Sequence, residues 1–348
     1  MMDFFDKIAK EVGEDYITHV DNIKEHETFV DTGSYIFNAL VSGSIFGGVS
    51  GNRITAIAGE TSTGKTYFAT AVVKNFLVQN PKGAVFYFDT ESAIEKDMLV
   101  SRGITGRFYK VDVATVEEFR HQAYKILDNY MKEPEEDRRP MMFVLDSLGM
   151  MSTTKETEDT LNDKQVRDMT KSQLIKGTFR ILTSKLAKAN VPMIVTNHTY
   201  DVVGAYVPTK EMGGGSGLKY AASTIIHLSK SKEKDGKEII GNIIKAKTNK
   251  SRLSKENQQV EIRLFYDERG LDNYYGLPQL ALKYGVFEKA GSYLKMPDGK
   301  KVYEKTILGD PEKYFTDDVM RQLDAAAKLE FTYGGREDPS DDSEESST

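Results

Sequence analysis

Residues 59–66 read Gly59-Glu60-Thr61-Ser62-Thr63-Gly64-Lys65-Thr66 and meet every fixed position of the pattern G-x-x-x-x-G-K-[ST]. An apolar run at 54–58 precedes this octet, and apolar side chains at helical spacing follow it over 67–76. This order of strand, glycine-rich loop and helix is the context that the pattern requires. Glycines let the backbone curl so that successive N–H groups point at one anion, and the start of the helix adds partial positive charge. The sequence therefore predicts a site for a nucleoside triphosphate.

All eight residues of the octet are expected to line this site. Lys65 should reach the β- and γ-phosphates, and the Thr66 hydroxyl should hold Mg²⁺. A carboxylate at the end of a neighbouring strand is the usual second partner of the ion. Asp146, which ends the apolar run 141–145, fits that role, and we expect it to act through a bound water. Without the phosphate loop, an aspartate at the end of a strand would be weak evidence for a Mg²⁺ ligand.

The composition favours a protein without disulfides or thiolate metal sites. The chain has 348 residues and no cysteine, and its five histidines show no metal-ligand spacing. No apolar run approaches the length of a membrane-spanning helix, and the first residues lack the basic-then-apolar order of a signal peptide. We therefore expect a soluble cytoplasmic protein.

The net charge of −6 lies mostly at the C-terminal end. Residues 336–348 hold a run of acids, one arginine and no apolar side chain, so they cannot repay the entropy of folding and are predicted to be disordered. The rest of the chain is close to neutral, and its lysines can still form local basic patches. Overall acidity therefore does not exclude a nucleic-acid partner.

Apolar runs and helical periods alternate through the middle of the chain. The runs at 84–88, 141–145 and 191–195 are short enough for strands buried on both faces, and helical periodicity appears at 116–130 and 169–186. This alternation predicts a parallel α/β sheet. A hairpin is predicted over 225–244, with its turn at 234–237, and a further strand over 260–266. After residue 277 we expect a helix, a hairpin around 298–299 and a helix over 316–329.

Polar side chains follow two more of the predicted strands. Glu91 lies just past the end of the run 84–88, where a carboxylate could orient or activate a water in line with the γ-phosphate. A solvated glutamate in a loop is the alternative that the residues alone leave open. His198 comes just after the run 191–195, at a place where a polar side chain could touch the γ-phosphate.

Two long segments without a clear helical or strand period follow the predicted strands at 141–145 and 191–195. They cover residues 151–168 and 199–217. Both should emerge on the same side of the sheet. A structureless stretch of this length inside a compact domain is either functional or disordered. Solvated surface loops remain the alternative, because neither segment is rich in aromatic residues.

Taken together, these motifs resemble the RecA-type recombinases, in particular their phage members. The resemblance covers residues 33–287 and is much more specific than the octet, which many families share. It rests on the ordered set Asp146-Ser147-Leu148-Gly149, Lys155-Glu156-Thr157-Glu158-Asp159, Asp168-Met169-Thr170, Phe179-Arg180-Ile181, Asn197-His198-Thr199-Tyr200 and Met212-Gly213-Gly214-Gly215-Ser216-Gly217.

The resemblance implies roles for individual residues. Glu91 corresponds to the catalytic glutamate, acting with Lys65, and His198 to a sensor of the γ-phosphate. Lys245 and Lys247 correspond to two lysines that reach the nucleotide of the neighbouring subunit, and their spacing puts them on one face of a strand. An exposed strand that merely carries lysines is the alternative for this pair.

Further implied roles concern DNA and the nucleobase. The segments 151–168 and 199–217 correspond to two DNA-binding loops, and Lys219 and Tyr220 to a subunit contact. Bacterial members place a tyrosine at the position of Met98 to stack on adenine, so base preference stays open here. The implied DNA-binding residues are Thr153, Lys155, Lys164, Arg167, Thr199, Gly213, Gly214, Gly215 and Ser216.

The implied fold class is α/β, a RecA-like P-loop NTPase core with a mostly parallel central sheet. We expect an N-terminal helical oligomerisation segment at 1–30, the core at 31–276, a small α+β module at 277–335 and the acidic tail at 336–348.

The implied function is an ATP-dependent homologous recombinase. Such a protein, a DNA-dependent ATPase, forms helical filaments on single-stranded DNA, captures duplex DNA and exchanges strands in recombination, repair and recombination-dependent replication. Its cofactors would be ATP and Mg²⁺, and its partners DNA, further copies of the chain, and single-strand-binding and mediator proteins, with no membrane. If the resemblance to phage members holds, its location would be the cytoplasm of an infected cell. A ring helicase motor and a regulatory ATPase that never touches DNA remain alternatives.

Overall fold

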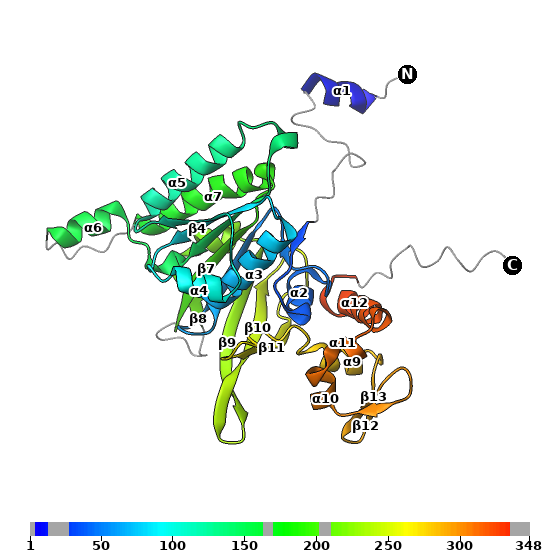
Figure 1. Cartoon of the computed structure of the whole chain (residues 1–348). Helices are drawn as coiled ribbons and strands as arrows, with labels where there is room; N and C mark the ends of the chain where they lie inside the picture. The colour runs from blue at the N-terminus through cyan, green and yellow to red at the C-terminus, as the bar shows by residue number, and fades with distance from the viewer. Residues whose placement is uncertain (1–3, 13–27, 163–169, 202–209, 335–348) are drawn as a thin grey trace.

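The structure, a computed structural model, describes residues 4–12, 28–162, 170–201 and 210–334. A nine-stranded sheet forms its centre, in the order β11-β10-β9-β3-β7-β6-β4-β5, with β8 paired to β7 (Figure 1). The strands are β3 (Ile54–Gly59), β4 (Ala84–Asp89), β5 (Phe108–Asp112), β6 (Met141–Asp146), β7 (Met193–Asp201), β8 (Lys210–Met212), β9 (Thr224–Asp235), β10 (Glu238–Lys250) and β11 (Gln259–Phe265).

The middle of this sheet is parallel. β3 pairs in parallel with both β7 and β9, and β4 pairs in parallel with both β5 and β6. At one edge, β10 pairs antiparallel with β9 and β11, which gives the predicted hairpin. The expected α/β fold with a mostly parallel sheet is therefore confirmed. Neither β5 nor the continuation of β7 past residue 198 was expected, because neither is a continuous apolar run.

Helices cover both faces of the sheet. α2 (Tyr35–Ser42) and α3 (Lys65–Gln79) pack on one face, and α5 (Val116–Tyr130) and α7 (Lys171–Ala189) on the other (Figure 1). Because successive strand residues point to opposite faces, one strand contributes buried side chains to the hydrophobic layers on both faces of the sheet. In β3, Ile57 joins the layer under α3, whereas Ile54 and Ala56 join the layer under α5 and α7.

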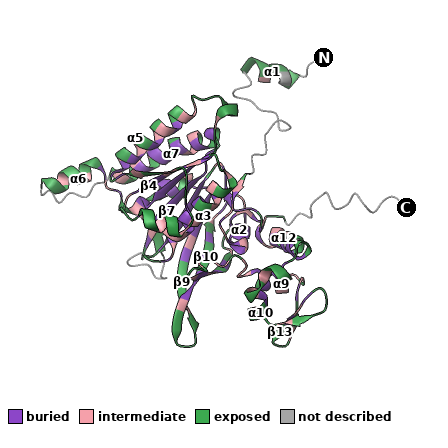
Figure 2. Ribbon diagram, viewed as in Figure 1, coloured by how far each residue is buried: buried purple, intermediate pink, exposed green. Residues whose placement is uncertain are grey.

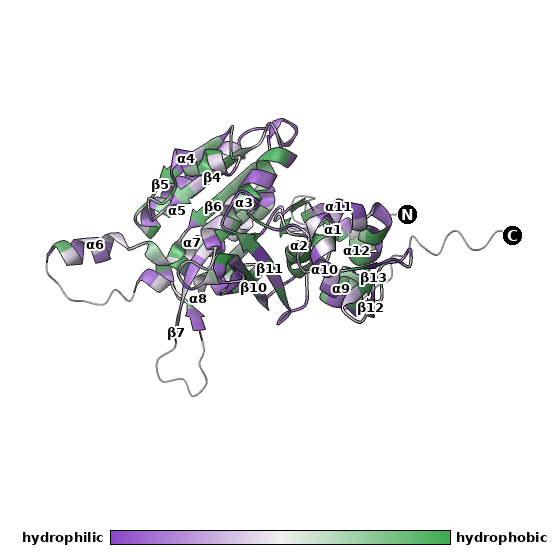
Figure 3. Ribbon diagram, turned by 60° about the horizontal axis from the view of Figure 1, so that its bottom comes forward, coloured by the Kyte–Doolittle hydropathy of each residue, from purple (hydrophilic) through white to green (hydrophobic). Residues whose placement is uncertain are grey.

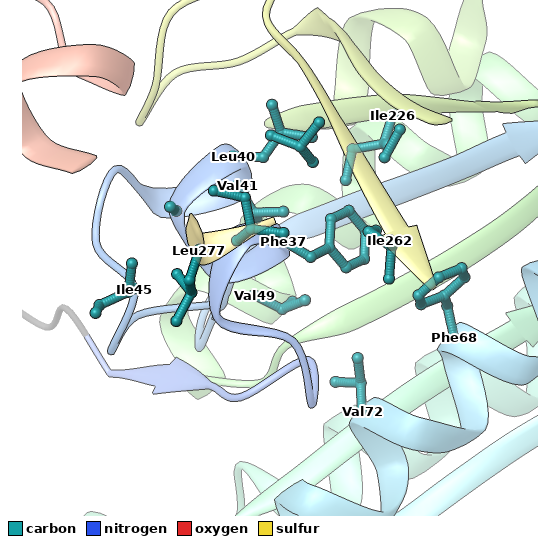
Figure 4. Close-up of a cluster of buried hydrophobic side chains, with 14 of the residues drawn as sticks. Phe37, Leu40, Val41, Ile45, Val49, Phe68, Val72, Ile226, Ile262 and Leu277 are labelled. Atoms are coloured by element: carbon teal, nitrogen blue, oxygen red, sulfur yellow. The ribbon is translucent and has the colours of Figure 1, made fainter. Parts of the chain in front are cut away.

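The layer beneath α2 and α3 continues into the C-terminal module. Figure 2 shows the buried residues concentrated along the sheet and on the inner helix faces, and Figure 4 shows part of this cluster. Labelled there are Phe37, Leu40, Val41, Ile45, Val49, Phe68, Val72, Ile226, Ile262 and Leu277.

The C-terminal module shares this core. Leu323 and Phe331 of its last helix are buried in the same cluster as α2, and the Asp324 carboxylate accepts hydrogen bonds from the Ser44 hydroxyl and the Ile45 N–H. A helix begins at Leu277, and the elements from there on pack directly on the core. The elements of the module are α9 (Leu277–Lys283), β12 (Glu288–Ala290), β13 (Tyr293–Lys295), β14 (Lys301–Val302), α10 (Glu304–Gly309), α11 (Pro311–Tyr314) and α12 (Asp317–Phe331).

Short elements complete the described chain. Within the predicted N-terminal segment 1–30, the structure describes a helix and a two-residue strand, while residues 13–27 lie outside the described part. The acidic tail 336–348 also lies outside it. The short elements are α1 (Phe4–Val12), β1 (Phe29–Val30), β2 (Val49–Ser50), α4 (Lys96–Ser101), α6 (Thr154–Leu161) and α8 (Ser216–Ala221).

A capping box begins α5. The Thr115 hydroxyl accepts a hydrogen bond from the Glu118 N–H at 3.2 Å, and Glu118 Oε2 accepts from the Thr115 N–H at 3.1 Å. We expect Thr115→Ala to lower the free energy of unfolding by about 1 kcal/mol, because it leaves an N–H at the helix start unsatisfied. Thr115→Ser keeps the acceptor and should behave like the parent chain. Urea denaturation of both variants measures the difference, and equal midpoints would contradict the capping role.

Candidate active site

The phosphate-loop motif forms the link between β3 and α3. Ser62 (φ 61°) and Gly64 (φ 93°) adopt left-handed backbone conformations, which curl the loop into an anion-binding shape. Gly59 allows a close approach of the backbone: a Cβ there would lie 2.6 Å from Thr63 Oγ1 and 2.8 Å from the Leu228 carbonyl oxygen. The glycines at both ends of the loop are therefore required by its geometry.

Lys65 lies folded back into this loop. Its side chain is buried, and its Nζ donates hydrogen bonds to the carbonyl oxygens of Gly59 (3.0 Å) and Glu60 (2.8 Å). Burial lowers the pKa of the Lys65 ammonium, and the nearby carboxylates of Asp146 and Glu91 partly offset this effect. A buried ammonium needs acceptors, and here the loop carbonyls supply them. Phosphate oxygens are stronger acceptors for the same group.

Asp146 is the centre of a buried hydroxyl network. Its Oδ2 accepts from Thr66 Oγ1 (2.7 Å) and from the Tyr87 hydroxyl (2.6 Å), and its Oδ1 accepts from Thr196 Oγ1. Burial and the adjacent Asp146 carboxylate raise the pKa of Tyr87 well above its ordinary value, so Tyr87 stays a neutral donor. The predicted pair of Thr66 and Asp146 is thus brought into direct contact. Tyr87 and Thr196 were not foreseen; both are hydroxyl residues inside otherwise apolar strands, and that is the signal that would have found them.

These two residues fit a magnesium ion. Mg²⁺ prefers hard oxygen ligands and usually keeps several waters, with one or two carboxylates and the substrate phosphates completing its shell. The Thr66 hydroxyl and the Asp146 carboxylate are such ligands, and they lie together at the start of α3. The described residues contain no group of three or more His, Cys, Asp or Glu that could hold a metal alone.

Glu91 is held beyond the carboxyl end of β4 by one donor just after the neighbouring strand β6 and one donor on β7, which lies on the far side of β6. Its Oε1 accepts from Ser147 Oγ at 2.7 Å and lies 3.3 Å from His198 Nε2. Strand register explains this meeting, because Asp89 pairs with Asp146 across β4 and β6. The structure therefore brings the predicted Glu91 and His198 together, and Ser147 joins them unforeseen.

The turn that carries Glu91 is itself fixed by hydrogen bonds. The buried Asp89 carboxylate accepts from the N–H groups of Glu91 (3.1 Å), Ala93 (3.3 Å) and Ile94 (3.1 Å). Thr90 Oγ1 also accepts from the Ser147 N–H at 2.8 Å and donates to the Ser147 carbonyl at 2.9 Å. The backbone position of Glu91 is therefore determined before any ligand binds.

Lys245 and Lys247 lie apart from this cluster. Both are exposed on β10, on either side of the buried Ala246, so they share one face as predicted. Lys245 Nζ lies 3.5 Å from Glu261 Oε1 on β11. Lys247 pairs across the strands with His227, whose pKa is lowered by burial and by the nearby Lys247 and Lys219. In the described parts of the chain, no hydrogen bond or ion pair joins either lysine to Lys65 or Asp146.

The first predicted DNA-binding loop contains a helix. α6 occupies residues 154–161, and the Thr153 hydroxyl caps it by accepting from the Glu156 N–H at 3.0 Å. The expectation of an irregular loop was wrong here, because Thr-x-x-Glu at 153–156 is a helix-start signal. Thr153 is 1% exposed, so we assign it a capping role and no longer a DNA contact. Lys155 is exposed, while Lys164 and Arg167 lie outside the described residues.

The second predicted loop leaves the site on an extended β7. Thr199, which was predicted to bind DNA, pairs with Met212 of β8. Its side chain is only 9% exposed, so it is poorly accessible to DNA. Asn197 Nδ2 donates to the Gly213 carbonyl at 2.8 Å, and the Gly213 N–H donates to the His198 carbonyl at 3.0 Å. Gly214 and Gly215 have positive φ, and Ser216 begins α8. Figure 3 shows α6 projecting outward from the sheet.

The phosphate loop also contacts this segment directly. Lys210 of β8 forms an ion pair with the Glu60 side chain.

Met98, at the position expected to meet a base, packs partly buried against the hydrophobic core. Within the described ranges, no helix has both the length and the hydropathy needed to cross a bilayer.

Comparison with known proteins agrees with this geometry. Residues 1–272 match the family described as RecA N-terminal domain. The chain is 33% identical to the Recombination and repair protein (UvsX) of Enterobacteria phage T4 over 255 residues, which are 73% of this chain and 63% of that protein. It is 27% identical to Protein RecA of Thermus thermophilus over 325 residues, 88% of each chain. It is also 27% identical to Protein RecA of Chloroherpeton thalassium over 304 residues, 85% of this chain and 82% of that one.

The family match covers most of the chain, and the matched range contains the phosphate loop, Glu91, Asp146 and His198. The chain spans 63% of the length of the phage T4 relative. The resemblance predicted from the sequence motifs is confirmed, and this chain belongs to the RecA family.

Proposed function

We propose that this chain is an ATP-dependent homologous recombinase that assembles on single-stranded DNA, pairs it with duplex DNA and exchanges strands. One observation carries the proposal. His198 meets Glu91 at 3.3 Å through its side chain, while its backbone carbonyl holds Gly213 of the second predicted DNA loop at 3.0 Å. A single residue thus connects the place of the γ-phosphate with a segment that would contact DNA.

The chemistry of ATP hydrolysis follows from the same residues. The curled loop and the start of α3 bind the phosphates, with Lys65 exchanging its two carbonyl acceptors for phosphate oxygens. Thr66 and Asp146 would hold Mg²⁺, which neutralises charge that develops on the phosphates. Among the described residues, both donors to Glu91 bind Oε1, so Oε2 is the oxygen that would orient a water and take its proton.

Assembly into an open filament is the second part of the proposal. Phe4 and Phe5 of α1 are 68% and 72% exposed, an apolar surface suited to a neighbouring copy. Lys245 and Lys247 are exposed on β10, and among the described residues neither has a hydrogen bond or ion pair with its own phosphate loop, as expected of lysines that serve a neighbour's nucleotide. A contact between different faces of identical subunits repeats into an open helix when its rotation does not close a ring. Single-strand-binding and mediator proteins are proposed partners from family membership alone.

A D-loop assay tests the whole proposal. We expect the purified chain to pair a single strand with homologous supercoiled duplex only when MgATP is present. Electron microscopy with MgATP and single-stranded DNA should show helical filaments. Closed hexamers would favour a ring helicase instead, and ATP hydrolysis that DNA does not stimulate would favour a regulatory ATPase.

Lys65→Ala should weaken MgATP binding by roughly 30-fold, about 2 kcal/mol, since charge-assisted hydrogen bonds to phosphate have this strength. Isothermal titration calorimetry measures the change. Lys74→Ala is the matched control, because Lys74 is an exposed lysine on the same helix. Equal loss in both variants would show that general positive charge, and not the Lys65 position, binds the nucleotide.

A further inference from the structure

The Asp146 carboxylate is reached by hydroxyl groups from three elements of the fold. Thr66 and Tyr87 both donate to Oδ2, at 2.7 Å and 2.6 Å, and Thr196 donates to Oδ1. Within the described ranges, no lysine, arginine or histidine forms an ion pair with this carboxylate. Hydrogen bonds from neutral hydroxyls therefore fix the orientation of the side chain on which the proposed magnesium site depends.

Strand register explains why two of these hydroxyls can reach Asp146. Tyr87 of β4 pairs in parallel with Val144 of β6, so Asp146 is the next residue of β6 on the same face. On the other side of β6, the last paired residues of β6 and β7 directly precede Asp146 and Thr196. The two hydroxyls thus come from the strands that flank β6, and they bind different oxygens of one carboxylate.

The ring of Tyr87 belongs to the hydrophobic core. It is fully buried in the layer under α3, and its centre lies 5.5 Å from the centre of the Phe108 ring on β5. A phenylalanine would fill the same space and would bury no polar atom, which costs free energy unless the atom is hydrogen-bonded. Core packing therefore explains the ring of Tyr87 but not its hydroxyl.

The hydrogen bonds leave little acceptor capacity on Asp146. An ionised carboxylate has about four lone-pair positions, two on each oxygen. Tyr87 and Thr66 take both positions on Oδ2, and Thr196 takes one on Oδ1. One position on Oδ1 is left for a further donor, such as a water bound to Mg²⁺. The direction of this position depends on the plane of the carboxylate, and so on the hydroxyls that hold that plane.

We propose that Tyr87 is a positioning residue for Mg²⁺. Its hydroxyl and that of Thr196 hold the Asp146 carboxylate in the plane that accepts a metal-bound water. Thr66 is no independent anchor, because its own hydroxyl oxygen would bind the ion. Tyr87 and Thr196 bind Asp146 before any ion arrives, so they can orient the carboxylate in advance. This inference rests on the proposed MgATP binding and deepens it by naming the residues that set its metal affinity.

Tyr87→Phe removes the hydroxyl and keeps the ring. We expect this variant to weaken the binding of Mn²⁺, a paramagnetic substitute for Mg²⁺, to the protein–ADP complex by roughly tenfold, the lower end of the range for groups that orient a metal ligand. An electron paramagnetic resonance titration in saturating ADP measures this affinity. The affinity for ADP in EDTA should match that of the parent chain, because the phosphate loop and Lys65 are unchanged.

The other oxygen of Asp146 provides a second pair of variants. Thr196→Val should weaken Mn²⁺ binding to a similar extent, whereas Thr196→Ser keeps a hydroxyl and should retain it. Tyr284→Phe is the matched control, because the Tyr284 hydroxyl also donates to a carboxylate at 2.6 Å, that of Glu330, but in the C-terminal module. Its Mn²⁺ affinity should equal that of the parent chain.

Unchanged Mn²⁺ affinity in Tyr87→Phe would overturn the inference. An equal loss in Tyr284→Phe would overturn it too, and so would an equal loss of ADP affinity in EDTA, because either result would indicate a general structural effect. Parent protein that binds ADP but no Mn²⁺ would contradict the magnesium site. Parent protein that binds no ADP at all would instead contradict the proposed function. Urea denaturation of each variant verifies that it is folded.

Discussion

Glu91→Gln is expected to slow DNA-stimulated ATP hydrolysis by about 10²–10⁴-fold, the usual contribution of a positioned general base. The amide has the size of the carboxylate and can still accept from Ser147 Oγ and lie beside His198 Nε2, so the turn after β4 should keep its shape. The amide cannot take a proton from water. MgATP binding should therefore persist while turnover falls, which single-turnover hydrolysis and calorimetry together measure.

Two further variants sharpen this result. Asp97→Asn removes an exposed carboxylate from the nearby α4 and should leave hydrolysis unchanged. Ser147→Ala removes one donor to Glu91 and should produce a smaller loss than Glu91→Gln, because the carboxylate remains but is less well oriented. If the Glu91→Gln protein hydrolyses ATP at the parent rate, another group activates the water and the assignment of Glu91 is wrong.

Local sequence was enough to predict the phosphate loop. Every requirement of that loop, the glycines at both ends, Lys65, Thr66 and the flanking strand and helix, lies within about two dozen consecutive residues. The strands β4 and β6 were found for a similar reason, since burial on both faces leaves a continuous apolar run. The position of Glu91 opposite His198 followed less directly, from the rule that parallel strands bring their carboxyl ends to one edge.

Contacts made by tertiary structure were not predictable in this way. Tyr87 and Thr196 come from different strands and meet only through Asp146. A hydroxyl inside an apolar strand marks each residue, but no local pattern shows that both bind the same carboxylate. Ser147 reaches Glu91 because β6 lies beside β4, a neighbour relation that the chain order does not state. The helix α6 was missed for a different reason: its capping signal at Thr153 is local and present in the sequence, but it was not used.

Lys245→Ala is expected to remove the stimulation of ATP hydrolysis by DNA, a loss of about 10³-fold if the lysine acts like a cation supplied by a neighbouring subunit. Binding of MgATP to the isolated chain should be unchanged, because Lys245 makes no contact with the phosphate loop among the described residues. In the monomer it pairs with Glu261 at 3.5 Å, and both side chains are about half exposed. Such a pair is weak, so leaving it for a phosphate costs little. Glu261→Gln should therefore retain stimulation.

Mixing two inactive variants decides whether Lys245 acts on its own nucleotide or on a neighbour's. A Glu91→Gln subunit still carries Lys245, and a Lys245→Ala subunit still carries Glu91. If the lysine acts across the interface, some contacts in a mixed filament join an intact Lys245 to an intact Glu91. In an equal random mixture these are roughly a quarter of all contacts, because each interface joins different faces of two subunits. DNA-stimulated hydrolysis should then return to a comparable fraction of the parent rate. A mixture no more active than its two components would mean that Lys245 serves its own subunit. The proposal that Lys245 contacts the nucleotide of a neighbouring subunit would then be wrong.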